Sequence, residues 1–229
     1  MVAEPDLCLE LALHREGHHN VVGLDEAGRG SWAGPVVAAA VVLPLDRGDL
    51  AAELNGVRDS KLLSPGRRQE LFELVQNVAA GVGVGVMPAS FIDQHGIVMA
   101  NREAMRQAVA SLPLTPSYLL IDYLRLPSVE LPQQGIPKGD RRHLSIAAAS
   151  IIAKVTRDRM MIEMDSLYPG YGFARHKGYG TRQHRDALYR LGPCDTHRLS
   201  FNPMRTLARA SETSGSEDRG NGSGRSSSE

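Results

Sequence analysis

The sequence has few residues that could cross-link the chain, because only two of its 229 residues are cysteines, Cys8 and Cys194. These two form no CxxC motif, which argues against a disulfide scaffold or a zinc knuckle and fits a reducing compartment. Long hydrophobic runs are also missing, since none approaches the roughly 20 residues of a membrane-spanning helix. The first residues lack a basic flank followed by an apolar run. We therefore expect no signal peptide, no membrane association and a cytoplasmic location.

An excess of either charge is absent too, because 26 Lys and Arg residues balance 26 Asp and Glu residues. Any surface for nucleic acid must therefore be local. Aromatic residues make up only 5% of the chain, and a group of them lies between residues 168 and 179, interleaved with Arg175 and Lys177. Rings beside basic residues favour stacking on a sugar or base, with the cations on the phosphate backbone. A glycine-rich surface loop is the alternative.

The stretch GLDEAGRG at residues 23–30 is the strongest indication of a functional site. It follows β-forming residues and places two adjacent carboxylates, Asp25 and Glu26, at the end of a predicted strand. Each opposes the ionisation of the other unless a cation neutralises them or water reaches them. Gly28 and Gly30 allow a tight turn and the close approach of a ligand, and the guanidinium of Arg29 suits phosphate. The pattern favours a divalent-metal site, with an exposed acidic turn as the alternative.

Two further acids occupy comparable places, because Asp122 ends the apolar run YLLID and Asp140 follows shortly after. Ligands collect beyond the carboxyl ends of strands in α/β sheets, although Asp122 also suits an ordinary turn. Adjacent residues of a strand face opposite sides, so Asp25 and Glu26 share a site only if the strand distorts, and Ala27-Gly28 offers a place for that. Oxygen-only ligands suit Mg²⁺ or Mn²⁺ and two-metal phosphoryl chemistry.

The other segments predict alternating strands and helices. Strands are expected at 20–26, 35–43, 81–87 and 118–122, the first two paired as a hairpin. Helices are expected at 5–14, 64–80, 88–94, 98–111, 144–159 and 181–191. Glycine alternates with valine at 81–87, which indicates that another segment packs closely on that strand. The segment from 123 to Gln134 is rich in proline and leucine and predicts a loop.

Taken in order along the chain, these motifs resemble the ribonuclease HII family. The resemblance covers about residues 21–203 and rests on DEAGRG at 25–30, DSK at 59–61, LID at 120–122, KGD at 138–140, SIAAASIIAKVTRD at 145–158 and HKGY at 176–179. It implies an α/β, ribonuclease H-like mixed sheet flanked by helices, with a small C-terminal helical part. We therefore expect an N-terminal helix and loop at 1–19, a catalytic domain with its C-terminal helical part at 20–209, and a disordered tail at 210–229.

The resemblance also implies an activity. The family cleaves the RNA strand of RNA–DNA hybrids and nicks duplex DNA on the 5′ side of an embedded ribonucleotide, leaving 3′-hydroxyl and 5′-phosphate ends. The implied ligands of Mg²⁺ or Mn²⁺, two ions when substrate is bound, are Asp25, Glu26, Asp122 and Asp140. The expected partners are such hybrids and ribonucleotide-containing duplexes, and the protein is expected to be a monomer.

Substrate contacts follow from the same resemblance. Gly28, Arg29 and Gly30 would read the 2′-hydroxyl, largely through backbone groups, since this hydroxyl is what distinguishes RNA from DNA. Tyr179 would stack on the neighbouring deoxyribose and reject a second ribose there. The residues placed for phosphates are Lys61, Ser145 and Lys154.

Two positions depart from the family pattern. Ser31-Trp32 stands where a small residue followed by an apolar one is expected, and Tyr123 stands where glycine is usual. Both leave the four acids intact, and Tyr123 is bulky enough to reroute the loop after Asp122. Two other functions are compatible with the residues. One is a non-catalytic module that binds nucleic acid through the basic stretches 138–159 and 175–185, and the other is a Mg²⁺-dependent phosphatase acting on a small ester.

Overall fold

The computed structural model describes residues 4–206, so the tail predicted at 210–229 lies outside the described residues. The centre is a five-stranded mixed sheet in the order β3-β2-β1-β4-β5. The strands are β1 (Val21–Ala27), β2 (Val36–Val42), β3 (Gly81–Met87), β4 (Tyr118–Asp122) and β5 (Gln133–Ile136). β2 pairs antiparallel with β1 and β3, while β4 pairs parallel with β1 and β5. The predicted hairpin of the first two strands is therefore confirmed.

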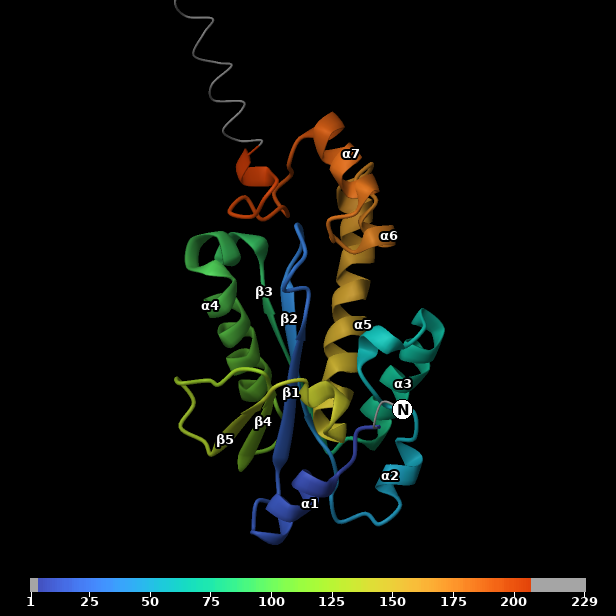
Figure 1. Ribbon diagram of the computed structural model, residues 1–229, viewed down its shortest axis with the longest axis vertical. Helices are drawn as coiled ribbons and strands as arrows, with labels where there is room; N and C mark the ends of the chain where they lie inside the picture. The colour runs from blue at the N-terminus through green and yellow to red at the C-terminus, as the bar shows by residue number, and fades with distance from the viewer. Residues whose placement is uncertain (1–3, 207–229) are drawn as a thin grey trace, which may run out of the picture.

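Helices cover both faces of the sheet (Figure 1). α4 (Ala89–Ala110) packs on one face, and α5 (Leu144–Leu167) with α3 (Pro65–Val78) packs on the other. α1 (Cys8–Arg15) and α2 (Leu50–Glu53) extend the second of these cores. α5 runs past the sheet and ends beside α6 (Phe173–His176) and α7 (Arg182–Leu191) (Figure 1). A smaller third core joins the end of α5 to these two helices.

Glycines allow the helices to lie very close to the sheet. A Cβ atom added to Gly83 or Gly85 of β3 would lie 2.1 or 1.9 Å from a backbone carbonyl oxygen of α4. On the opposite face, a Cβ on Gly23 of β1 would lie 2.2 Å from the backbone of Ser145 in α5. Any side chain at these positions would push the helices outward. The close packing predicted from the Gly-Val alternation is therefore confirmed.

Local signals set most element boundaries. The hydroxyl of Ser64 accepts the N–H of Arg67 at the start of α3, and that of Thr181 accepts the N–H of His184 at the start of α7. The two helices predicted at 88–94 and 98–111 are the two halves of α4, which is interrupted at Gly96, where φ is 79°. α5 extends beyond its predicted end at residue 159.

One expectation about the sheet was wrong. The segment up to Gln134 was predicted to be a loop, whereas β5 begins at Gln133 and pairs in parallel with β4. β5 lacks the alternation of branched residues that marks a strand, and it forms because the edge of β4 supplies hydrogen-bonding partners. Gly135 lets β5 lie against the loop before it, since a Cβ there would lie 2.6 Å from the carbonyl oxygen of Leu124.

Candidate active site

The four predicted acids come from three segments that meet at one edge of the sheet. β1 and β4 are parallel neighbours, so their carboxyl ends lie together. Asp25 and Glu26 lie near the end of β1, and Asp122 ends β4. Asp140 lies on a short 3-10 helix, η2 (Gly139–Arg141). This helix is tied to β4 because the N–H of Gly139 donates to Oδ1 of Asp122 at 2.7 Å.

Asp25 and Glu26 leave opposite faces of a regular strand. Asp25 pairs with Ala39, which belongs to the core under α5, and Glu26 pairs with Ala38, which belongs to the core under α4. The pairing of β1 with β2 stays regular through Ala27. The distortion expected at Ala27-Gly28 is therefore absent from the strand, and the chain turns only at Gly28, where φ is 89°. Asp25 and Glu26 nevertheless both lie near enough to Asp122 for its charge to raise their pKa values.

A polar cleft of about 440 Å³ opens at this edge. It is lined by Glu26, Arg29, Asp59, Lys61, Asp122, Tyr123, Lys138, Asp140 and Arg141. Asp25 is buried behind this lining, with only 4% of its surface exposed, and its Oδ1 accepts the N–H of Glu26 at 2.7 Å. Three of the four predicted acids thus line one cleft, and the carboxylate of the fourth, Asp25, accepts the backbone N–H of its neighbour Glu26 behind it.

The acids raise one another's pKa values. Burial raises the pKa of Asp25 well above its ordinary value, and the charges of Glu26 and Asp122 raise it further. Burial also raises the pKa of Glu26 and of Asp122. For Asp140, burial and then the charges of Asp59 and Asp122 raise the pKa to about 6. Negative charge at this edge is therefore only partly neutralised by the protein itself.

Lys61 is the main cation of the cleft. Burial alone would lower the pKa of its amine, but the charges of Asp25, Asp59 and Asp140 outweigh that effect and raise it. Arg29 acts chiefly on Glu26, since its Nη1 lies 3.7 Å from Oε1 of that residue and its charge lowers the pKa of Glu26 more than the charge of Lys61 does.

The acidic cluster fits a hard divalent cation by its chemistry. Among residues 4–206, no group of three or more His, Cys, Asp or Glu side chains is arranged to hold a metal ion as it stands. The donors at the cleft are nevertheless all carboxylate oxygens, and their raised pKa values have mutual repulsion among their causes. A bound dication would offset that repulsion, and oxygen donors are those preferred by Mg²⁺ and Mn²⁺.

The Gly28-Arg29-Gly30 turn follows β1 directly and keeps backbone donors available. Arg198 donates to the carbonyl oxygens of Gly28 and Arg29 at 2.7 and 2.9 Å. Within the described part of the chain, the N–H groups of Arg29 and Gly30 donate to no protein acceptor. The turn therefore directs the carbonyl groups of Gly28 and Arg29 into the protein, while the N–H groups of Arg29 and Gly30 have no protein acceptor among the described residues.

Of the other predicted substrate residues, Tyr179 and Lys154 lie beside each other at the surface, whereas Ser145 is buried. Tyr179 is 37% exposed, and Nζ of Lys154 lies 5.4 Å from the centre of its ring while forming an ion pair with Asp158 at 2.7 Å. Ser145 is completely buried, and its hydroxyl donates to Oε1 of Glu10 at 2.7 Å. A contact between Ser145 and a phosphate would require this hydroxyl to leave Glu10.

Four cleft residues were not among the individually predicted site residues: Asp59, Tyr123, Lys138 and Arg141. Asp59 is buried and accepts hydrogen bonds from Arg141 and from the backbone of Lys61. The DSK motif contained the signal for it, but the site role was assigned to Lys61 alone. Tyr123, noted as a departure from the family pattern, is exposed in the cleft with a left-handed φ of 65°. Glycine adopts that conformation without strain, which tyrosine does not.

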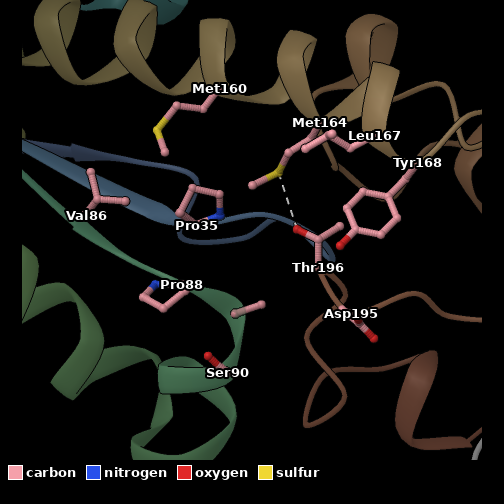
Figure 2. A pocket seen from close by; sticks show the side chains of 11 residues that line it. Pro35, Val86, Pro88, Ser90, Met160, Met164, Leu167, Tyr168, Asp195 and Thr196 are labelled. Carbon is pink, nitrogen blue, oxygen red and sulfur yellow. Dashed lines mark hydrogen bonds between the residues drawn. The ribbon is translucent and has the colours of Figure 1, made fainter.

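A second cavity, of about 280 Å³, lies apart from the acids. Met160 and Met164 of α5 point toward Pro35 and Pro88 across it, and Thr196 contacts the sulfur of Met164 (Figure 2). None of the predicted site residues lines this cavity. The acidic cleft is therefore the candidate active site.

Comparison with known proteins gives a family for this arrangement. Residues 22–204 match the family model described as Ribonuclease HII. The chain belongs to the ribonuclease HII family. Ribonuclease HII of Chloroflexus aurantiacus is 54% identical over 203 residues, which cover 87% of this chain and 94% of the relative. The chain is thus a ribonuclease H, from a family that depends on divalent metal ions and cleaves RNA in RNA–DNA hybrids.

Solved structures of ribonucleases H share the fold. The ribonuclease H2 from Pyrococcus horikoshii OT3 is 27% identical with a TM-score of 0.71, covering 83% of this chain and 98% of that one. Bst-RNase HIII in complex with Mn²⁺ is 23% identical with a TM-score of 0.62, covering 88% of this chain and 73% of that one. The mixed ribonuclease H-like sheet predicted from the motifs is confirmed. Among residues 4–206 of this ribonuclease HII homologue, every helix is too short or too polar to span a lipid bilayer.

Proposed function

We propose that this ribonuclease HII homologue hydrolyses the RNA strand of RNA–DNA hybrids and nicks duplex DNA on the 5′ side of an embedded ribonucleotide. The products carry a 3′-hydroxyl and a 5′-phosphate. The observation that supports this proposal is the gathering of acids from β1, β4 and η2 at one polar cleft, beside a turn with free backbone donors. A cytoplasmic location and a monomeric state remain predictions from the sequence.

The acids are the proposed metal ligands. Asp25, Glu26, Asp122 and Asp140 would hold Mg²⁺ or Mn²⁺, two ions with substrate, which supply a water nucleophile at neutral pH and offset charge at the leaving oxygen. The complex of Bst-RNase HIII with Mn²⁺ supports the choice of ions. The raised pKa values of Asp25 and Asp140 support the ligand set, because buried acids that repel one another are stabilised by a shared cation.

Substrate selection is assigned to groups around this cleft. The backbone N–H groups of the Gly28-Arg29-Gly30 turn bind the 2′-hydroxyl, and the ring of Tyr179 stacks on the next deoxyribose. Lys61 reaches a phosphate from within the cleft, and Lys154 does so from beside Tyr179. Ser145 binds a phosphate only if the hydrogen bond from its hydroxyl to Glu10 breaks.

The test uses a duplex with one embedded ribonucleotide, with and without Mg²⁺ or Mn²⁺. The wild-type protein should nick it only with metal. Asp25→Asn should lower the rate more than roughly 100-fold, because even the partners of metal ligands are worth 10–100-fold. Asp46→Asn, the same change at an exposed position after β2, is the control and should leave the rate unchanged.

Three outcomes would contradict the proposal. Near-normal nicking by Asp25→Asn would reject its role as a ligand. Binding of the duplex without cleavage would indicate a non-catalytic module. Turnover of a small phosphate ester in place of the duplex would indicate a phosphatase.

A further inference from the structure

A buried arginine contacts both of the segments that the proposed function assigns to sugar recognition, the one that follows the Gly28-Arg29-Gly30 turn and the one that precedes Tyr179. Arg157 lies on α5 and has no exposed surface. Among the described residues, its guanidinium forms no ion pair with a carboxylate. It donates instead to four oxygen atoms, namely the carbonyls of Pro35, Lys177 and Ala33 and the hydroxyl of Ser31.

These acceptors belong to two segments far apart in the sequence. Nε and Nη2 of Arg157 donate to Pro35 and Ala33 at 2.8 and 3.1 Å, just after the Gly28-Arg29-Gly30 turn. Nη1 donates to the carbonyl of Lys177 at 2.9 Å, two residues before Tyr179. The ring of Tyr179 itself has its centre 5.4 Å from Cζ of the same guanidinium. One side chain thus holds the backbone on both sides of the proposed sugar site.

The first turn also rests directly on Arg157. Ser31 Oγ accepts from Nη2 of Arg157 at 2.8 Å and donates to the carbonyl of Gly28 at 2.8 Å. A Cβ atom on Gly28 would lie 1.9 Å from Nε of Arg157, so only glycine fits there. The position of the turn is therefore set by the guanidinium beneath it.

Arginine is suited to this task because its guanidinium is planar, permanently charged and carries five donors in a fixed fork. Lysine carries three donors on a single atom and cannot span acceptors on two segments in the same way. Hydrogen bonds from a charged donor in a buried place are also stronger than those from a neutral one. The acceptors around Arg157 therefore require the several donor atoms of a guanidinium and not only a positive charge.

We propose that Arg157 is a positioning residue that sets which sugars the enzyme accepts. It fixes the separation between the Gly28–Ser31 turn, which binds the ribose 2′-hydroxyl, and the ring of Tyr179, which stacks on the following deoxyribose. A ribose followed by a deoxyribose makes both the 2′-hydroxyl contact and the stacking contact, while an all-RNA strand makes only the 2′-hydroxyl contact. This inference rests on the proposed function and deepens it, because it names the residue that sets the preference for the junction.

The experiment compares two substrates with Mg²⁺, a DNA duplex with one embedded ribonucleotide and a hybrid whose whole strand is RNA. The quantity measured is the ratio of kcat/KM for the first to kcat/KM for the second. Arg157→Lys should lower that ratio roughly 10-fold, since it loses at least one hydrogen bond from a charged donor. Ser31→Ala, which removes only the link between Arg157 and Gly28, should lower it by a smaller factor.

Arg159→Lys is the matched control. It lies two residues further along α5, is exposed, and bonds only to Gln69 while packing on Phe72. Its ratio should equal that of the wild type. A purely structural role for Arg157 would reduce the amount of folded enzyme and leave the ratio unchanged, because both substrates would lose equally.

The outcomes are separable from those of the proposed function. If the wild type cleaves both substrates and the ratio stays within twofold for Arg157→Lys and Ser31→Ala, the positioning role is overturned. If Arg157→Lys does not fold, as judged by circular dichroism, the milder Ser31→Ala decides. A wild type that cleaves neither substrate would overturn the proposed function, and this inference with it.

Discussion

Replacing Asp140 by asparagine should stabilise the metal-free protein while removing its activity. The pKa of Asp140 in the folded state is about 6, above its ordinary value of 3.8. The folded state therefore holds this proton more tightly than the unfolded state does. As the pH rises from about 4 through 6, ionisation of Asp140 costs folding stability, and the cost persists at higher pH. An asparagine cannot ionise, so the variant does not incur it.

The size of the effect follows from the difference in pKa. Each unit of pKa corresponds to ~1.4 kcal/mol, so the difference between 3.8 and about 6 corresponds to at most ~3 kcal/mol. Asp140 borders a cleft that is open to water, and we therefore expect about half of this, ~1.5 kcal/mol. For a domain of this size, ~1.5 kcal/mol raises Tm by about 3–6 °C.

The assay is thermal unfolding in EDTA at pH 8 and again near pH 4.5. Asp140→Asn should melt about 3–6 °C above the wild type at pH 8, and the difference should shrink at the lower pH. Asp46→Asn, at an exposed position, should match the wild type at both. Adding Mg²⁺ or Mn²⁺ should raise the Tm of the wild type more than that of the variant, because a cation bound only to the folded state stabilises it. An equal or lower Tm for Asp140→Asn in EDTA at pH 8 would refute the reasoning.

Three further predictions concern stability, each measured as the unfolding free energy in urea. Gly85→Ala should cost roughly 1–3 kcal/mol because its Cβ would lie 1.9 Å from a backbone oxygen of α4, while Gly66→Ala in open space on α3 should cost nothing; equal costs would contradict this. Burial lowers the pKa of His184 and of His197 to about 4, so acid destabilises the fold as the pH falls below about 6.5. The cost of His197→Gln relative to wild type should therefore be smaller at pH 5 than at pH 7, and a constant cost would argue against it. Ser64→Ala should cost ~1 kcal/mol through the lost N-cap of α3, and an unchanged unfolding free energy would contradict that role.

Much of the fold could be predicted from local patterns. β1, β2, β3 and β4 carry runs of apolar residues, and α3 and α7 begin with hydroxyl caps that are visible in the sequence. β5 could not be predicted, because the reason for its extended conformation is the edge of β4 and not its own residues. The full length of α5 was also missed, since its last turns are held by the third core, which no local pattern reveals.

The acids of the site were visible for a similar reason, because Asp25 and Asp122 end apolar runs. The residues that surround these acids could not be predicted from the sequence. Asp59 is buried beside Arg141 through a contact between residues 82 positions apart. Arg157 and Arg198 would be assigned to the surface by residue type, and they are buried because carbonyl groups of the turn after β1 surround them. Such contacts join residues that are far apart in the sequence, so local sequence patterns do not predict them.

The long helix α5 has a mechanical consequence. Its 24 residues span about 36 Å, from the acid-bearing end of the sheet to the core that holds α6 and α7. Its first ten residues are all buried, so this part of the helix cannot tilt without displacing the strands beneath it. The C-terminal part is therefore attached to a helix whose N-terminal end is held in place by the sheet. We therefore expect a duplex that contacts both ends of α5 to meet a constant separation between the acids and the C-terminal part.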